Sequence, residues 1–276
     1  MASIAVGRQD LEPTLVGHRG NEALRAAFLG TIAEPKALLN VLCRYIQFNA
    51  AFGPGLANLA GEIAARQGLF RDKDEPVLLI SDRAAEVASD FFHAAVDEFD
   101  DRATPWRDTH RTLAQACLKG MGGYFGFAPE KLNEILALNQ GTQDAIERVF
   151  SGYGIGAKLE DRRLFEGMGF HAGSEVLADQ EFTIIDKLLK EQLPEMVQAL
   201  KSMRVRLGSE KHNAYYWISI HTSVEADHFD AALQGVNKGL RFYVGPDAPE
   251  TVKGWILEGF RSFAKLQADF MNALTS

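Results

Sequence analysis

The chain has 276 residues, of which 46% are hydrophobic and 24% are charged, as is ordinary for a globular protein. Its net charge is −8 and no more than two basic residues are adjacent, so neither a nucleic acid nor an anionic membrane surface is expected as a partner. No stretch approaches the ~18 consecutive apolar residues of a membrane span and no signal peptide is indicated, so we expect a cytoplasmic protein.

Helical periodicity dominates the sequence, and we expect an all-α protein. Residues 1–30 are assigned to a polar N-terminal arm and residues 31–276 to one helical domain. Only residues 76–80 (PVLLI) and 241–244 (RFYV) resemble strands, and both are short. The helical segments expected in chain order are 21–67 with breaks at Pro35 and Gly53-Pro54-Gly55, 81–101, 107–120, 128–138, 140–151, 160–178 with a continuation beyond Gln180, a helix containing 221–229, and a last helix to about Leu274. We predict a single bundle of seven to nine helices.

Two local signals mark helix boundaries late in the chain. Gly208 followed by Ser209 is typical of a helix stop and a new N-cap. Asp247, with Glu250 three residues later, matches a capping box in front of the last helix.

The segment HTSVEADHF (221–229) carries the strongest chemical signal. A helix turns 100° per residue, so His221, Glu225 and His228 fall on one face, which also carries the apolar side chains of that helix. A carboxylate buried between two imidazoles is costly unless something compensates its charge. Imidazole and carboxylate together suit first-row transition metals, iron and manganese in particular, and a cation would offset the buried charge.

The segment 81–101 supplies a second pair of candidate ligands. Glu86 and His93 are seven residues apart and therefore lie on one side of a helix. They flank its apolar side, on which we place Phe92, Val96 and Phe99. Taken alone, this pair is better explained as an exposed Glu and an exposed His.

The segment LFEGMGFHAGSEVLADQEF supplies a third candidate carboxylate, Glu175, with Asp179 and Glu181 as nearby alternatives. His171 stands one turn before Glu175 and is a candidate ligand or supporting residue, and Asp179 is a candidate supporting residue. The glycines of this segment leave little side chain, which permits close approach of a neighbouring helix or a ligand. The remaining histidines of note, which we interpret as surface or capping residues, are His18, His110 and His212.

The ordered set Glu-x6-His, a lone Glu, and His-x3-Glu-x2-His resembles the haem-oxygenase-like di-metal oxidases, which include CADD-type proteins, N-oxygenases and an alkene-forming fatty-acid decarboxylase. The set falls on Glu86 and His93, on Glu175, and on His221, Glu225 and His228, and RYIQFNAAFGPGLANLA (44–60) is similar to the first helix of that fold. The resemblance implies a haem-oxygenase-like bundle in which these six residues bind two iron ions, or manganese. It also implies O2 and a small organic molecule as substrates, with N-oxygenation, desaturation or oxidative C–C cleavage as outcomes, and a homodimer as a common assembly.

Two alternatives stay open at this point. One is a metal-free helical enzyme of the pyrroloquinoline-quinone-synthase or thiaminase type, in which His and Glu transfer protons. The other is a non-catalytic helical interaction protein whose His/Glu network is structural. Haem binding is disfavoured, because no histidine lies between His18 and His93.

Overall fold

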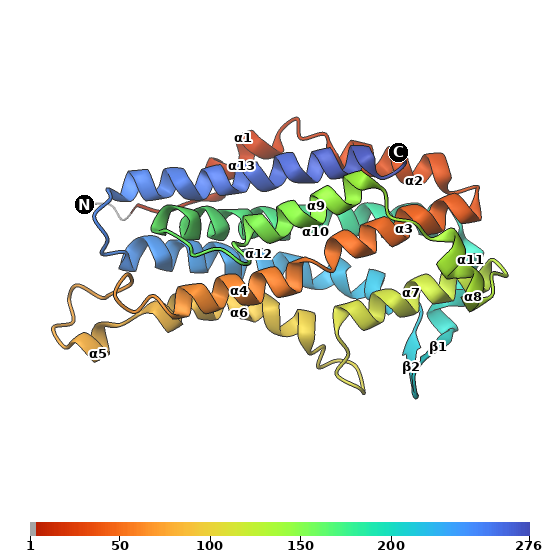
Figure 1. The fold of residues 1–276 in the computed structure, drawn as a ribbon, viewed down its shortest axis with the longest axis horizontal. Coiled ribbons are helices and arrows are strands. Elements are labelled where there is room, and N and C mark those ends of the chain that lie inside the picture. The colour runs from red at the N-terminus through yellow and green to blue at the C-terminus, as the bar shows by residue number, and fades with distance from the viewer. Residues whose placement is uncertain (1–3) are drawn as a thin grey trace.

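A computed structural model describes residues 4–276, apart from the side chains of Ile135 and of residues 223–226. The described chain is an elongated all-α bundle with one small β-hairpin (Figure 1), which confirms the predicted fold class. Its elements are α1 (Arg8–Leu15), α2 (Gly20–Thr31), α3 (Pro35–Asn49), α4 (Phe52–Ala64), α5 (Leu78–Ser81), α6 (Ala84–Phe99), α7 (His110–Tyr124), α8 (Pro129–Ile135), α9 (Gln140–Gly152), α10 (Asp161–Gln192), α11 (Pro194–Ser202), β1 (Arg204–Leu207), β2 (Glu210–Asn213), α12 (Tyr216–Phe242) and α13 (Pro249–Ala273).

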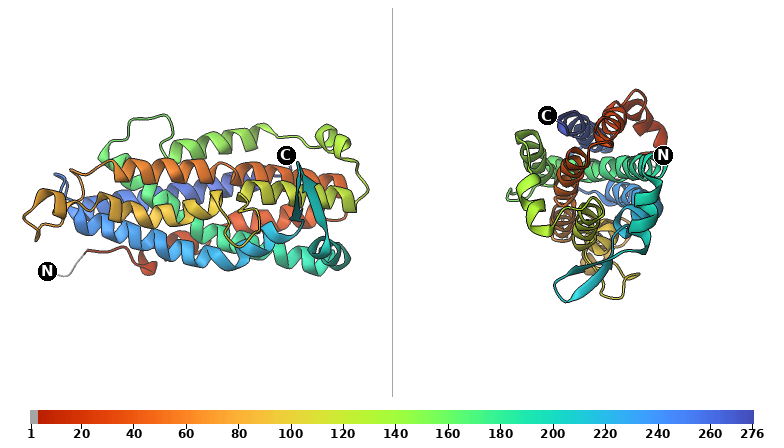
Figure 2. Two further views of the ribbon diagram at one scale, coloured as in Figure 1. Left: turned by 90° about the horizontal axis from the view of Figure 1, so that it is seen from below. Right: turned by 90° about the vertical axis from the view of Figure 1, so that its right-hand side faces the viewer.

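The long helix α10 organises the bundle. It spans 32 residues and packs along both α12 and α13, while α6 packs against α4 and α12. Viewed end-on, these helices lie side by side (Figure 2). No helix in the described part of the chain has an apolar stretch long enough to cross a membrane.

Glycines bring the backbones of α10 and α13 into contact. A Cβ added at Gly169 of α10 would lie 1.8 Å from the carbonyl oxygen of Ile256, and one added at Gly259 of α13 would lie 1.8 Å from that of Glu166. No side chain fits in either place, because the obstacle is backbone rather than a movable side chain. The close approach expected from the glycines of residues 164–176 therefore occurs, and the partner is α13.

The N-terminal residues contribute more than a polar arm. The segment 8–15 forms α1, and α2 packs against α10 and α13. Leu24 and Phe28 of α2 are fully buried, so the helix is an integral part of the bundle.

Several local predictions are wrong. Residues 76–80 are not a strand but lead into α5, and residues 241–244 end α12, with Tyr243 making one bridge to Phe70. Gly208 is not a helix stop: at φ +61 it forms the turn of the β1–β2 hairpin, for which glycine is favoured. The last helix has Ala248 as its N-cap, so the capping box at Asp247 does not form.

The buried face of α6 also differs from the prediction. Phe92, Val96 and Phe99 are exposed, and the buried stripe is instead rich in alanine, consisting of Ala84, Val87, Ala88, Phe91, Ala94 and Ala95. Small side chains let α6 lie close to α4 and α12, so side-chain size rather than hydrophobicity alone decides which face points inward.

Replacing Gly169 with Ala is expected to lower the free energy of unfolding by roughly 3 kcal/mol, because the added methyl group must displace backbone of α13. The control is Gly254→Ala in α13, where an added Cβ meets nothing within 4 Å; Ala there should stabilise the protein by about 0.5–1 kcal/mol through lower backbone entropy. Urea unfolding of the two variants measures the difference, and equal stabilities would contradict the backbone contact.

Candidate metal centre

Four helices bring histidines and carboxylates together inside the bundle. The contributing positions are the last turn of α6, the first residue of α7, the middle of α10 and the first half of α12, and they supply Asp97, Glu98, His110, His171, Glu175, His221 and His228. All four histidines are buried. The side chains form two groups, which we call the Glu98 cluster (Glu98, His110 and His221) and the Glu175 cluster (Asp97, His171, Glu175 and His228).

The Glu98 cluster offers one ligand atom from each of its three residues within 4.8 Å of the others. His110 Nδ1 lies 3.0 Å from Glu98 Oε1, and the His110 and His221 rings meet at 4.5 Å between centroids. His221 Nδ1 donates to the carbonyl oxygen of Trp217 at 2.6 Å, which fixes the tautomer and the orientation of the ring.

Burial and neighbouring charges set the protonation of these two histidines. Burial, together with repulsion from His110, holds the pKa of His221 well below its usual value, although its bond to Trp217 opposes this. Burial also disfavours the charged form of His110, but the carboxylate of Glu98 outweighs burial and raises the pKa of His110. His221 is therefore a neutral imidazole, the form that binds metals.

The Glu175 cluster is arranged around one carboxylate. Glu175 Oε1 lies 3.2 Å from His171 Nδ1, and Glu175 Oε2 lies 3.6 Å from His228 Nδ1. On its other side, His228 Nε2 hydrogen-bonds Asp97 Oδ2 at 3.0 Å, and this bond lowers the pKa of the Asp97 carboxyl. A carboxylate that hydrogen-bonds one nitrogen of a histidine fixes the orientation of its ring.

His171 holds an unsatisfied buried nitrogen. Burial lowers its pKa, against the charge of Glu175, so its ring is neutral. Nδ1 faces Tyr153 Oη at 3.3 Å, whereas Nε2 is buried without a hydrogen-bond partner. Buried polar atoms almost always have partners, so an orphaned nitrogen indicates an unmet ligand.

A small central cavity joins the two clusters. Its volume is about 30 Å³, room for about one or two water-sized molecules. Its polar lining residues are Asn49, Glu98, Ser174, Glu175, Glu181, His221 and His228. The Glu98 cluster also borders a larger cavity of about 310 Å³, which we call the side cavity. That cavity is mostly apolar, with Ile46, Pro54 and Trp217 among its walls and Arg111 also in its lining.

Glu181 is a buried carboxyl of a different kind. Tyr45 Oη and Gln267 Nε2 each donate to it at 2.7 Å. Burial raises its pKa to about 7, although both hydrogen bonds act in the opposite direction. It lines the central cavity as a group that is mostly neutral below pH 7.

The structure brings some of the predicted ligands together and separates others. Glu175, His221 and His228 meet around the central cavity, with His171 beside them as expected. His93 is exposed, and its ring lies 5.7 Å from that of His228. Asp179 is half-buried and does not line the cavity. The side chain of Glu225 lies outside the described residues.

Glu86 does not join this group. Its side chain is 48% exposed, lies near the start of α6, and pairs with Arg83 at 3.4 Å. Glu86 and His93 do share a face of α6, as their spacing predicts, but this face points outward because the alanine-rich stripe is the one that packs.

Three residues of the clusters were not predicted: Asp97, Glu98 and His110. Glu98 continues the buried stripe of α6, seven residues after Phe91, and two carboxylates in the last helical turn oppose the helix dipole. Only the position of the two carboxylates is readable in the sequence, because packing decides which stripe of α6 is buried. The interpretation of His110 and His212 as surface or capping residues is wrong, since both are buried.

The donor set fits a transition-metal centre. Imidazole and carboxylate are the ligands that iron, manganese and zinc take in proteins. Asp97, Glu98 and Glu175 together carry three negative charges, which two divalent ions would offset. In the Glu98 cluster all three residues offer ligand atoms close enough to hold one ion. In the Glu175 cluster, His171 and His228 flank the Glu175 carboxylate at 3.2 and 3.6 Å.

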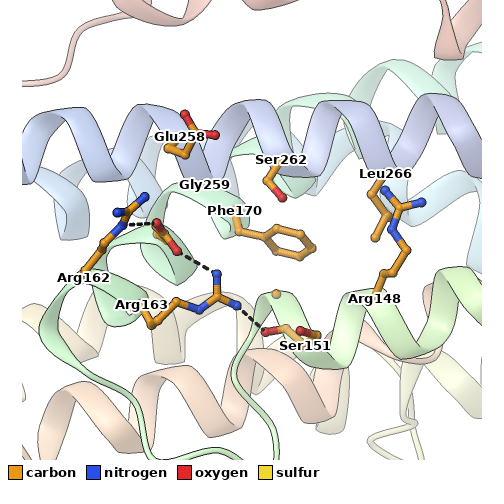
Figure 3. A pocket seen from close by; sticks show the side chains of 11 residues that line it. Arg148, Ser151, Arg162, Arg163, Phe170, Glu258, Gly259, Ser262 and Leu266 are labelled. Carbon is orange, nitrogen blue, oxygen red and sulfur yellow. Dashed lines mark hydrogen bonds and ion pairs between the residues drawn. The ribbon is translucent and has the colours of Figure 1, made fainter.

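Another cavity, of about 290 Å³, lies between α9, α10 and α13 (Figure 3). Its lining includes Arg148, Arg162 and Arg163 but no histidine or cysteine. Glu166 accepts from Arg162 and Arg163, each at 2.7 Å, and Arg148 pairs with Asp269 at 3.0 Å. The arginines thus have partners already, and the cavity offers no metal-binding set.

Comparison with known proteins supports the fold. No protein-family model and no curated protein matches the chain. Among solved structures, it is similar to a CADD-like protein of unknown function from Nostoc punctiforme PCC 73102, with a TM-score of 0.51 and 16% identity over 97% of each chain. The resemblance to CADD-type proteins seen in the sequence therefore extends to the fold over nearly the whole length.

Replacing Glu181 with Gln is expected to change how stability depends on pH. The carboxyl has a pKa of about 7 in the folded protein and an ordinary value of 4.5. The stabilisation that it gives is therefore complete below pH 4.5 and is lost as the pH rises through 7, by about 3 kcal/mol. Urea unfolding at pH 5 and pH 8 should show a smaller loss in Glu181→Gln than in the parent protein. An equal loss in both would mean that Glu181 is ionised throughout.

Proposed function

We propose that this protein is a non-haem di-metal oxidase that uses O2 to oxidise a small organic molecule, with two iron ions, or manganese, as its cofactor. One observation carries the proposal: Glu98, Glu175, His221 and His228 line one small cavity inside a CADD-like bundle. His110, His171 and Asp97 lie directly beside Glu98, Glu175 and His228, respectively. Such groups are buried together at high cost unless cations compensate them.

The Glu98 and Glu175 clusters are the proposed ligand sets. They keep Glu175, His221 and His228 from the sequence-based ligand set and leave out Glu86 and His93, while the side chain of Glu225 lies outside the described residues. The residues that they add are Asp97, Glu98, His110 and His171. Asp97 and the carbonyl of Trp217 orient His228 and His221 through hydrogen bonds at 3.0 and 2.6 Å. The metals would bind O2 and supply the electrons that activate it.

Other residues around the two clusters have separate roles in the proposed oxidation. The apolar walls of the two cavities exclude water from the reacting groups. The side cavity would hold the substrate, because it is apolar and borders Glu98, His110 and His221 directly. Glu181, with its pKa of about 7, can hold a proton at the edge of the central cavity.

A second candidate function is metal-free acid–base catalysis. The hydrogen-bonded pair of His110 and Glu98 faces the side cavity, and the pKa of His110 is raised. A histidine oriented by a carboxylate in a cavity is the arrangement of a general acid or base. Dependence of activity on metal distinguishes the two functions.

Metal content tests the proposed centre. Protein loaded anaerobically with ferrous iron and desalted should retain close to two iron atoms per chain by elemental analysis. His221→Gln and Glu175→Gln should each lose about one, since they remove one ligand from separate clusters. Glu86→Gln is the matched control and should retain both, because its side chain is exposed and paired with Arg83. Full occupancy in the two cluster variants would contradict the assignment.

Oxygen uptake tests the reaction. The iron-loaded protein should consume O2 faster than free ferrous iron in the presence of one member of a panel of amino acids, amines and fatty acids, and chelated protein should not. Iron-loaded protein with no such uptake would refute the oxidase while leaving the metal centre. Full activity of chelated protein toward a substrate would establish the acid–base function instead.

A further inference from the structure

A second group of metal-ligating side chains lies at the β-hairpin. Asp108 precedes α7, while Glu210 and His212 stand on β2, and one ligand atom from each lies within 4.8 Å of the others. The hairpin extends from the bundle beside α7 (Figure 1). These three residues, the hairpin site, share no member with the Glu98 or Glu175 clusters.

His212 is the central residue of the hairpin site. Its side chain is 1% exposed, and Nδ1 and Nε2 are both buried without a hydrogen-bond partner. Asp108 Oδ1 is nevertheless 3.1 Å from Nδ1, and Glu210 Oε2 is 3.8 Å from Nε2. Asp108 Oδ1 is thus within hydrogen-bond range of Nδ1 but forms no hydrogen bond with it. Two ligands of one ion have this relation, because ligands about 2.1 Å from a tetrahedral zinc lie about 3.4 Å apart and point at the metal. An oxygen of Glu210 lies near enough to both to be the third ligand.

The backbone holds these side chains in place. Residues alternate across a strand, so Glu210 and His212 project from the same side of β2, with His212 paired to Val205 of β1. Asp108 accepts at its carbonyl from Asp101 N at 2.9 Å, and its own N–H donates to Thr104 Oγ1 at 2.8 Å. The residues of the hairpin site therefore come from two separately held segments, β2 and the loop before α7.

The local charge favours a dication. Asp108 is buried and carries one negative charge, and Glu210 adds another. Asp101, paired to Asp108 through the backbone, also has a buried oxygen, Oδ2, without a hydrogen-bond partner. A protonated His212 would leave this group net negative, whereas a divalent ion bound to neutral His212 would balance Asp108 and Glu210.

We propose that Asp108, Glu210 and His212 bind a divalent transition metal of the zinc type, with water completing its coordination. One nitrogen and two carboxylate oxygens are a usual zinc donor set. The ion would link the hairpin to the loop before α7. Since α7 begins at His110, the same link would also restrain the position of His110 in the Glu98 cluster.

The test is zinc binding by the full chain. After chelation and dialysis against Zn²⁺, bound zinc per chain is measured for the parent protein and for three β2 variants. Glu210→Gln and His212→Gln should each bind one equivalent less than the control Lys211→Gln, whose side chain is on the opposite side of the strand. The side chain of Glu210 is partly exposed, so Glu210→Gln is expected to fold. This variant decides the test if circular dichroism shows that His212→Gln does not fold.

A comparison with the core separates this site from the proposed di-metal centre. His221→Gln should keep the zinc equivalent that Glu210→Gln loses. Zinc counts in Glu210→Gln equal to those of Lys211→Gln would overturn the proposal. So would a parent protein whose bound zinc is all removed by His221→Gln.

Discussion

The arrangement of this protein depends on burying ionisable groups in one small volume of an apolar bundle. Hydrogen bonds offset part of the free-energy cost of removing carboxylates and imidazoles from water. The hydrogen-bonded groups are Asp97 with His228, Glu98 with His110, and Glu181 with Tyr45 and Gln267. Pairing leaves His171 Nε2 without a partner and leaves three carboxylates within the two clusters. Bound cations would offset the charge of these carboxylates, and for this reason the two clusters, rather than the arginine-lined cavity of Figure 3, are the proposed metal-binding site.

The packing of α10 makes this convergence possible. Backbone contact at Gly169 and Gly259 draws α13 onto one side of α10, and α12 packs on another, so His171 and Glu175 are directed toward His228. The alanine stripe of α6 has the same effect on the opposite wall, where close approach brings Asp97 and Glu98 to the cavity. Small residues therefore determine where the charged ones meet.

The fold and the site carry different parts of the functional argument. A CADD-like bundle is a scaffold, and the similar solved protein is itself of unknown function. The proposed chemistry is inferred from the donor set, from the apolar side cavity next to Glu98, and from the hydrogen bonds that orient the rings of His221 and His228. The hairpin site follows from the same reasoning applied to His212, whose buried nitrogens have neighbours but no hydrogen bonds.

The sequence by itself determined the helical class, the approximate helices, and the ligand types on α10 and α12, because periodicity places His171 with Glu175, and His221 with His228, on single faces. It could not choose between Glu86 and Glu98, since both lie on regular stripes of α6 and only packing against α4 and α12 decides which stripe is buried. It gave no hint of His110, which reaches the site from a different helix. Turns such as Gly208 were misjudged because a local signal of chain reversal fits a hairpin as well as a helix end. Contacts between segments distant in sequence are decided by the tertiary structure, in which the shapes of all packed faces must be satisfied at once.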